Sequence, residues 1–266
     1  VQASSIVLAD GAVLNMSEAS LALEQCVVLH SQDGISGKGN DFTSNEIFRL
    51  QNYNGGTDKL LGFIGSAPEN AYIGIFGTIK TATLVDVSDK LTGGYKFVEN
   101  VTVQSGHEVT FEDGVWVDLN GKEFIIRGEV NINSAEEIVA IKNNIYLGTL
   151  RVYEGAILHM ENASIIMTGS GSWDSDSMHV GGEFVMQGGT MQITNGLTID
   201  GAGTAGSANG GDVRLDGVIV KSTVYNNGTL TAENVQFESK VTNRGTGVYI
   251  DCTFNSYLQV NGVEHL

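Results

Sequence analysis

Apolar and polar residues alternate along the C-terminal part of the chain. In one stretch the alternate positions are Val218, Val220, Ser222 and Val224. Alternation is the period of a β-strand, because successive side chains point to opposite faces, whereas a helix repeats every three to four residues. The pattern therefore predicts strands whose alternate residues point into a core.

Similar residues return at these positions every 17 residues, which predicts a solenoid. The recurring sets are Gly211, Gly228, Gly245 and Gly262; Val218, Val235 and Cys252; Val220, Phe237 and Phe254; Ser222, Ser239 and Ser256; and Val224, Val241 and Leu258. A short period with stacked apolar positions is typical of solenoids, in which each coil adds a layer about 4.8 Å from the last. We expect the glycines, with Asn226, Asn227 and Asn243, at corners where the backbone takes positive φ.

The repeat continues upstream in a looser form. Residues 182–191 align with residues 228–237. The step from Met191 to Val220 is one coil plus 12 residues, and the glycine-rich run 200–211 accounts for the excess as a side loop. The stacking therefore extends beyond the regular repeats.

The whole chain is expected to form one β-solenoid domain, residues 1–266. Residues 155–164 are similar in sequence to residues 11–20, which indicates that both parts of the chain belong to one solenoid. Residues 45–97 do not follow the 17-residue repeat and are interpreted as a lateral insertion or as wide coils. A capping-box pattern at Ser134–Glu137 predicts a short helix to Lys142.

The fold class that follows is all-β, a single-stranded right-handed parallel β-helix (β-solenoid). Its coils have about 17 residues in the C-terminal part, and lateral loops are inserted between strands. Right-handedness is expected because crossovers between parallel strands are right-handed in nearly all cases. The alternative is a left-handed hexapeptide coil.

One segment carries a resemblance to a known group. Residues 181–191, Gly-Gly-Glu-Phe-Val-Met-Gln-Gly-Gly-Thr-Met, resemble the coils of secreted bacterial β-helix proteins of the pectin-lyase-like group, adhesin-type members especially. The resemblance covers residues 150–266 well, and 1–45 and 98–133 loosely. It implies an extracellular or cell-surface location, and it carries no catalytic residue because a fold does not determine a function.

Charge and cysteine content restrict the partners. The chain has 31 acidic and 14 basic residues and a formal net charge of −17. This balance argues against nucleic acid or an anionic membrane as partner, since both require basic patches. The chain has no run of 18 apolar residues, so membrane insertion is not expected. Cys26 and Cys252 would lie at opposite ends of a solenoid, beyond disulfide reach.

The segment Gly169–Val180 has a composition that suggests a site. Asp174 and Asp176 alternate, so both carboxylates could reach one Ca²⁺ ion while serine hydroxyls and carbonyls complete its oxygen shell. The rest of any known Ca²⁺ motif is absent. The alternatives are a solvated loop and a ligand-binding site that uses Trp173. No other cofactor is expected.

A catalytic interpretation rests on stacked carboxylates. Asp216 and Glu233 are one coil apart and, with Asp174, would serve a polysaccharide lyase or glycoside hydrolase of the β-helix type. The segments in which active β-helix hydrolases resemble one another, Asn-Thr-Asp, Asp-Asp, Gly-His-Gly and Arg-Ile-Lys, are absent. Catalysis is therefore the alternative hypothesis.

The favoured hypothesis is a non-catalytic extracellular protein, either a surface adhesin or a fibre or sheath subunit. The outward residues of the last coils, Tyr225 and Tyr257 among them, are interpreted as one flat wall that binds a polysaccharide or a neighbouring subunit. The closing strand Val260–Val263 would offer an open edge for end-to-end self-association.

Overall fold

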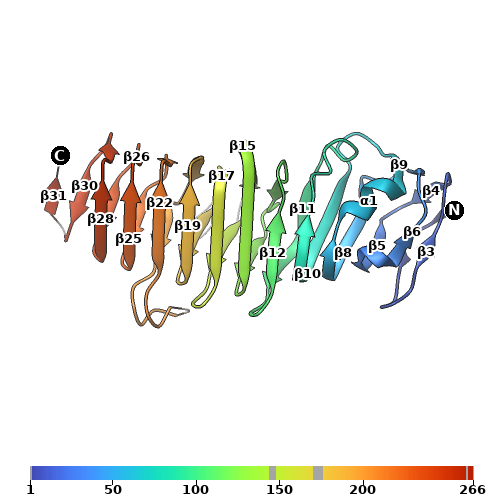
Figure 1. The fold of residues 1–266 in the computed structure, drawn as a ribbon, viewed down its shortest axis with the longest axis horizontal. Coiled ribbons are helices and arrows are strands. Elements are labelled where there is room, and N and C mark those ends of the chain that lie inside the picture. The colour runs from blue at the N-terminus through green and yellow to red at the C-terminus, as the bar shows by residue number, and fades with distance from the viewer. Residues whose placement is uncertain (1, 144–147, 170–175, 206, 262, 266) are drawn as a thin grey trace.

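The chain forms a long rod of stacked β-coils, with the N-terminus at one end and the C-terminus at the other (Figure 1). The computed structural model describes residues 2–143, 148–169, 176–205, 207–261 and 263–265. Nearly all strand pairs are parallel, which confirms the predicted all-β parallel solenoid. The front strands in Figure 1 point upward while the chain advances from right to left, so the coil is right-handed.

Each coil contributes one strand to each of three walls. The first wall contains β12 (Glu108–Phe111), the start of β15 (Glu129–Asn143), the start of β17 (Ile157–Met167), β19 (Glu183–Gln187), β22 (Asp212–Asp216), β25 (Thr229–Glu233) and β28 (Thr246–Ile250). The second contains the start of β11 (Tyr95–Val103), β13 (Val117–Asp118), the ends of β15 and β17, β20 (Thr190–Ile193), β23 (Ile219–Val220), β26 (Gln236–Phe237) and β29 (Thr253–Phe254). The third contains the end of β11, β14 (Glu123–Ile126), β16 (Thr149–Val152), β18 (Ser177–Val180), β21 (Leu197–Ile199), β24 (Val224–Asn226), β27 (Val241–Asn243) and β30 (Leu258–Val260).

The predicted inward ladder is confirmed by the strand register. Val220 pairs with Phe237, and Phe237 pairs with Phe254. The two rings stack with centroids 5.0 Å apart and planes 9° apart. Val220 and Phe237 are fully buried, whereas Phe254, in the last coil, is half-buried.

The 12-residue excess is also confirmed as a side loop, because Met191 pairs directly with Val220. The loop folds back along the rod and is anchored to an earlier coil. The backbone N–H of Ala208 and the side-chain amide of Asn209 both donate to the Glu154 carboxylate, at 2.8 and 2.6 Å.

The corner glycines are required by close packing and not by positive φ. Gly211, Gly228 and Gly245 stack at the corner between the third and first walls, and none of them has positive φ. A Cβ at Gly228 would lie 2.4 Å from the carbonyl oxygen of Gly211, and one at Gly245 would lie 2.1 Å from that of Gly228. Adjacent coils therefore approach too closely for any side chain here.

Two buried asparagines satisfy polar groups at the same corner. Asn226 donates from its side-chain amide to the Asn243 side-chain oxygen at 2.7 Å and to the Thr246 carbonyl at 2.8 Å. Both lie in strands and have no positive φ, contrary to the expectation from the sequence. Their role is to bridge consecutive coils.

Residues 45–97 belong to the stack and form coils longer than 17 residues. β8 (Glu46–Gly56) and β10 (Tyr72–Leu84) continue the second wall, since Phe48 pairs with Ile73 and Ile73 with Tyr95. Farther towards the N-terminus this wall contains β5 (Val27–Ser31) and β2 (Ile6–Val7).

The first coils are completed by short elements. A four-stranded parallel sheet holds β1 (Gln2–Ala3), β4 (Ser20–Leu23), β7 (Asn40–Phe42) and β9 (Ile64–Ser66), and β3 (Leu14–Asn15) pairs with β6 (Ile35–Ser36). A 3-10 turn (η1, Gln32–Gly34) and the single-turn helix α1 (Asp58–Phe63) lie beside β6. No helix among the described residues is long and apolar enough to cross a bilayer.

One local expectation is wrong. The helix predicted from Ser134 to Lys142 is absent, because β15 runs to Asn143 and pairs on both sides with β13 and β17. Pairing with neighbouring coils overrides the weak local capping signal. At the C-terminal end, β31 (Val263–His265) pairs antiparallel with β30, and end-to-end self-association stays a prediction.

Both cysteines are free thiols, as their separation predicted. Burial, together with the nearby Glu46 carboxylate, raises the pKa of Cys26 to about 11. Cys252 is half-buried in the last coil and lies near the carbonyls of Ala232 and Ile250. Neither thiol lies in a reactive setting, which needs exposure and nearby positive charge.

The ladder makes a direct stability prediction. Replacing Phe237 by Ala removes the ring between Val220 and Phe254, and we expect a loss of about 3–5 kcal/mol in the free energy of unfolding. Urea unfolding followed by circular dichroism measures it. Gln236→Ala, at the outward position of the same strand, is the matched control, with an expected loss below about 0.5 kcal/mol. Equal losses for both variants would contradict the assignment of faces.

Candidate functional site

The predicted calcium and ligand loop is only partly within the described structure. Trp173 and Asp174 lie outside the described residues, so their roles stay predictions. Asp176 is fully buried at φ 48°, and its Oδ1 accepts a hydrogen bond from the Asn143 side-chain amide. Burial raises the pKa of Asp176, while this hydrogen bond lowers it. The described residues contain no group of three or more His, Cys, Asp and Glu that could hold a metal.

The predicted carboxylate pair is placed as expected. Asp216 and Glu233 are register partners in β22 and β25, and both are exposed. Asp216 accepts a hydrogen bond from the Asn234 side-chain amide at 3.3 Å. The stacking is confirmed, and the catalytic role remains a prediction.

The outward residues that include the two predicted tyrosines do not form one flat wall. Strand β23 ends at Val220 and β24 begins at Val224, so a corner divides the surface that the sequence suggested was flat. Tyr225, 39% exposed, lies on the third wall and pairs with Thr242. Tyr257 precedes β30, and the Lys240 ammonium lies 5.0 Å from its ring centroid. The single-wall interpretation is wrong.

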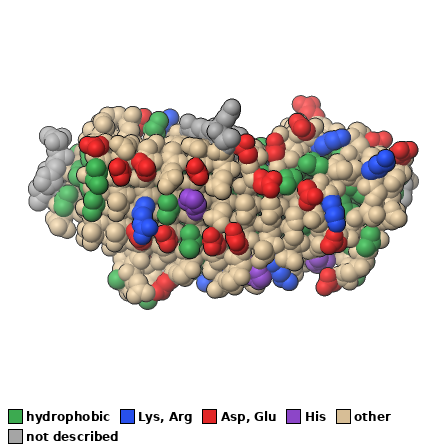
Figure 2. All heavy atoms as spheres, in the orientation of Figure 1, with side chains coloured by type: hydrophobic (Ala, Val, Ile, Leu, Met, Phe, Trp, Pro, Cys, Tyr) green, Lys and Arg blue, Asp and Glu red, His purple; other side chains and the backbone are tan. Residues whose placement is uncertain are grey.

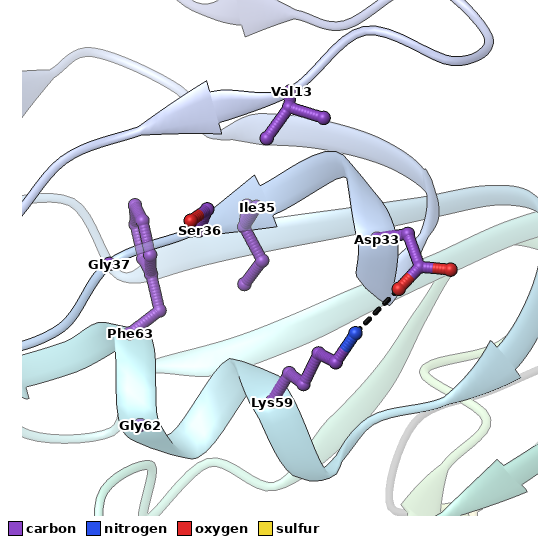
Figure 3. Close-up of a pocket in the computed structure, with 8 residues that line it drawn as sticks. All are labelled: Val13, Asp33, Ile35, Ser36, Gly37, Lys59, Gly62 and Phe63. Carbon is purple, nitrogen blue, oxygen red and sulfur yellow. Dashed lines mark hydrogen bonds and ion pairs between the residues drawn. The ribbon is translucent and has the colours of Figure 1, made fainter.

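Several hollows on the surface are large enough for a small ligand, and two of them differ clearly in chemistry. The one beside α1 measures about 480 Å³ and is lined by apolar groups such as Val13 and Phe63 (Figure 3). Its charged residues, Lys59 and Asp33, pair with each other at 2.5 Å. The other, about 440 Å³ on the third wall, is lined by His179, Thr198 and Tyr225 with further threonine, serine and asparagine side chains. Both are open depressions without a desolvated charge directed into them.

The first wall is acidic. Figure 2 shows Asp and Glu side chains in excess over Lys and Arg across the face formed by β12 to β25. The outward carboxylates of this wall are Glu108, Glu129, Glu161, Glu183, Asp212, Asp216 and Glu233. Arg214 is the cation among them, and it pairs with Asp212 at 2.7 Å. This wall repels anionic ligands.

The second wall differs in its N-terminal half, where cations and aromatic rings gather on the outward face. We call this surface the cation–aromatic strip; its members are Arg49, Tyr72, Phe76, Lys96, Trp116 and Lys142. All six are half-buried, with the inward positions of the same strands filled by core residues such as Ile73, Tyr95 and Val117. The alternation of the strands therefore fixes the strip on the outside.

Every cation of the strip lies over a ring from an adjacent coil. The distance from the cation to the ring centroid is 5.7 Å for Arg49 over Phe76 and 4.8 Å for Lys96 over Tyr72. It is 3.3 Å for Lys142 over Trp116. Contacts of this kind contribute roughly 0.5–1 kcal/mol when exposed and about 2 when desolvated. The strip is thus ordered by its own side chains.

Two glycines make room for these side chains. Gly94 lies under Trp116, and a Cβ there would approach the indole ring to 2.7 Å. A Cβ at Gly74 would lie 2.3 Å from the Glu46 carboxylate, the partner of Arg49. The small residues let a large ring and an ion pair lie flat on the sheet.

Arg49 is neutralised within the strip, but the lysines are not. Glu46 binds Arg49 through two hydrogen bonds, at 2.6 and 2.7 Å. Within the residues that the structure describes, no carboxylate lies within ion-pair distance of Lys96 or Lys142. Burial lowers the pKa of Lys142, Asp118 raises it, and Lys96 lowers it. Two partly desolvated ammonium groups are therefore available to an anion.

The cation–aromatic strip was not predicted from the sequence. Trp116 stands between Val115 and Val117, and Lys96 between Tyr95 and Phe97, so both occupy outward positions of alternating segments. An aromatic residue at an outward position was the signal that could have identified the surface. Lys142 was hidden by the incorrect helix prediction.

Comparison of the chain with protein-family models, with curated proteins and with solved structures found no match. The resemblance seen in residues 181–191 is therefore confirmed only as a parallel β-solenoid. Function must accordingly be inferred from the surface chemistry of the walls.

The charge environment of Lys142 is testable by its titration. We expect ¹³C NMR of reductively methylated lysines to show Lys142 losing its proton below the ordinary pH range of a lysine. Asp118→Asn should lower the pKa of Lys142 further, because it removes the carboxylate that favours the charged form. Lys96→Met should raise it by removing a like charge. An unchanged Lys142 signal in both variants would contradict the described geometry.

Proposed function

We propose that this chain is a non-catalytic extracellular protein of the pectin-lyase-like β-helix type, with an adhesive role. In this proposal the cation–aromatic strip binds an acidic polysaccharide. The observation that carries the proposal is the pair Lys96 and Lys142, each held over an aromatic ring with no ion-paired carboxylate among the described residues. It stands out on a chain whose net charge is −17.

The chemistry of the strip suits an acidic sugar better than other anions. Ammonium groups pair with carboxylates and sulfates through charge-assisted hydrogen bonds. The exposed parts of Tyr72 and Trp116 add apolar surface beside the ammonium groups, against which the C–H groups of a sugar can pack. A phosphate or a small carboxylate would use only the cations.

The form of the wall suits a polymer. Successive coils present side chains at a constant rise of about 4.8 Å along the rod. A long repetitive ligand can bind several such positions at once, and simultaneous binding raises the overall affinity well above that of one contact. A flat sheet surface leaves the polymer accessible, as adhesion requires.

Three expectations from the sequence stay predictions beside this proposal. They are a polysaccharide lyase or hydrolase that uses Asp174, Asp216 and Glu233, a Ca²⁺ ion at Asp174 and Asp176, and end-to-end self-association. Product release from acidic glycans, tested with and without Ca²⁺ and with Asp216→Asn, would decide the first.

The proposal predicts that the intact chain binds hyaluronan or polygalacturonate and does not bind neutral dextran. Trp116→Ala and Lys142→Met should each weaken binding of the acidic glycan about tenfold, since a desolvated cation–aromatic contact is worth about 1–2 kcal/mol. Isothermal titration calorimetry at one fixed salt concentration measures the affinities.

Arg127→Gln provides the matched control, because Arg127 lies 3.9 Å over the Tyr153 ring at a corner away from the strip. It removes one positive charge and one cation–aromatic contact, as Lys142→Met does. The affinity for the acidic glycan should stay within about twofold of the wild-type value. Absence of binding to every acidic glycan would refute the proposed function. So would an equal loss in the Arg127 and Lys142 variants.

A further inference from the structure

Along the axis of the strip, a positively charged residue returns every two coils. The register places Arg49, Gly74, Lys96, Asp118 and Lys142 in one outward row, one residue per coil. Cations therefore occupy every second coil, about 10 Å apart at twice the strand spacing. A glycine separates the first two cations and a carboxylate separates the last two.

The same period governs the rings. Tyr72 lies in the coil after that of Arg49, where it pairs with Glu46. Trp116 lies over Gly94, and its coil is two coils after that of Tyr72. Lys96 and Lys142 reach back over Tyr72 and Trp116 respectively, so each lysine and its ring form one unit. The strip thus contains two equivalent units, Lys96 with Tyr72 and Lys142 with Trp116, two coils apart.

Asp118 occupies the midpoint between the two units. It pairs with Lys96 on one side and with Lys142 on the other in the strand register, and it is 9% exposed. Its Oδ1 accepts a hydrogen bond from the Asn120 backbone N–H at 3.0 Å, which holds the carboxylate in place. A fixed negative charge therefore stands where the middle of a bound ligand would lie.

We propose that the strip selects polysaccharides that carry one anionic group per disaccharide and lie along the rod axis, and that Asp118 weakens the binding of polymers charged on every sugar. This inference rests on the proposed function and adds its specificity. Two coils span about 10 Å, which is comparable to the length of one disaccharide in an extended chain. Anions one disaccharide apart would meet Lys96 and Lys142.

A polymer with an anion on every sugar would place an additional carboxylate beside Asp118. Like charges brought together in a partly buried interface are strongly unfavourable, and such a repulsive element is a common basis of specificity. In an alternating polymer the sugar at this position is uncharged, and its hydroxyls can donate to Asp118. The same residue thus disfavours one class and accepts the other.

The ends of the strip limit the length of the ligand it recognises. Val28 precedes Arg49 in the row and Ile166 follows Lys142, so apolar residues border it on both sides. Arg49, whose charge Glu46 neutralises, adds little to anion binding. The two lysine units span three coil steps, about 14 Å, and therefore match about three sugars of an extended chain.

The test compares hexasaccharides of hyaluronan, with one carboxylate per disaccharide, and of galacturonate, with one per sugar. Calorimetry with the intact chain should give at least about tenfold tighter binding of the hyaluronan hexasaccharide. Asp118→Asn should strengthen galacturonate binding about tenfold and change hyaluronan binding by less than about twofold. The asparagine keeps the acceptor for the Asn120 N–H, so the local turn is preserved.

Asp89→Asn is the charge-matched control, since Asp89 is exposed in the turn before β11 and outside the row. It lowers the overall negative charge equally and should favour both ligands to the same small extent. Equal affinity of the wild type for the two hexasaccharides would overturn the inference while leaving the proposed function intact. This outcome does not depend on whether the Asp118→Asn variant folds. Binding of neither glycan would refute both. Tight competition by polyglutamate would assign the strip to an acidic protein segment instead.

Discussion

Parallel hydrogen bonding between consecutive coils is the constraint on which this structure depends. It fixes each residue above the corresponding residue of the coil before it, so one register determines both the core and the surface. A slip by one residue would turn every inward side chain outward. The stacked rings of Phe237 and Phe254 inside and the row from Arg49 to Lys142 outside are two results of the same pairing. Stability and recognition are therefore not independent properties of this rod.

The sequence predicted the architecture where the coils have equal length. A stride of 17 residues needs only three repeats to be seen, and even the side loop after Asp200 could be identified as an excess over it. The coils within residues 45–97 could not be aligned in the same way, because they are longer and contain bulges, as in the pairing of β8 with β10. The false helix before Lys142 had a similar origin, since a local capping signal says nothing about the neighbouring coils.

The strip was hidden from the sequence for a related reason. Arg49, Lys96 and Lys142 form one row, yet they are separated by 47 and 46 residues, and the intervening coils differ in length. No fixed interval links them, so only the pairing of strands reveals their common face. The sites that the sequence did suggest lie in the regular coils or in the segment 173–176. Regularity made those positions visible without making them chemically distinctive.

An anion-binding face on a chain of net charge −17 must act at short range. At physiological salt the Debye length is about 8 Å, so the carboxylates of the first wall are largely screened from a ligand on the second. Contacts over an aromatic ring, such as that of Lys142 with Trp116 at 3.3 Å, lie well inside this distance and are partly desolvated. Long-range repulsion therefore slows the approach of a polyanion more than it weakens the bound state. Asp118 then affects only the bound state, in which the strip distinguishes ligands by the spacing of their charges.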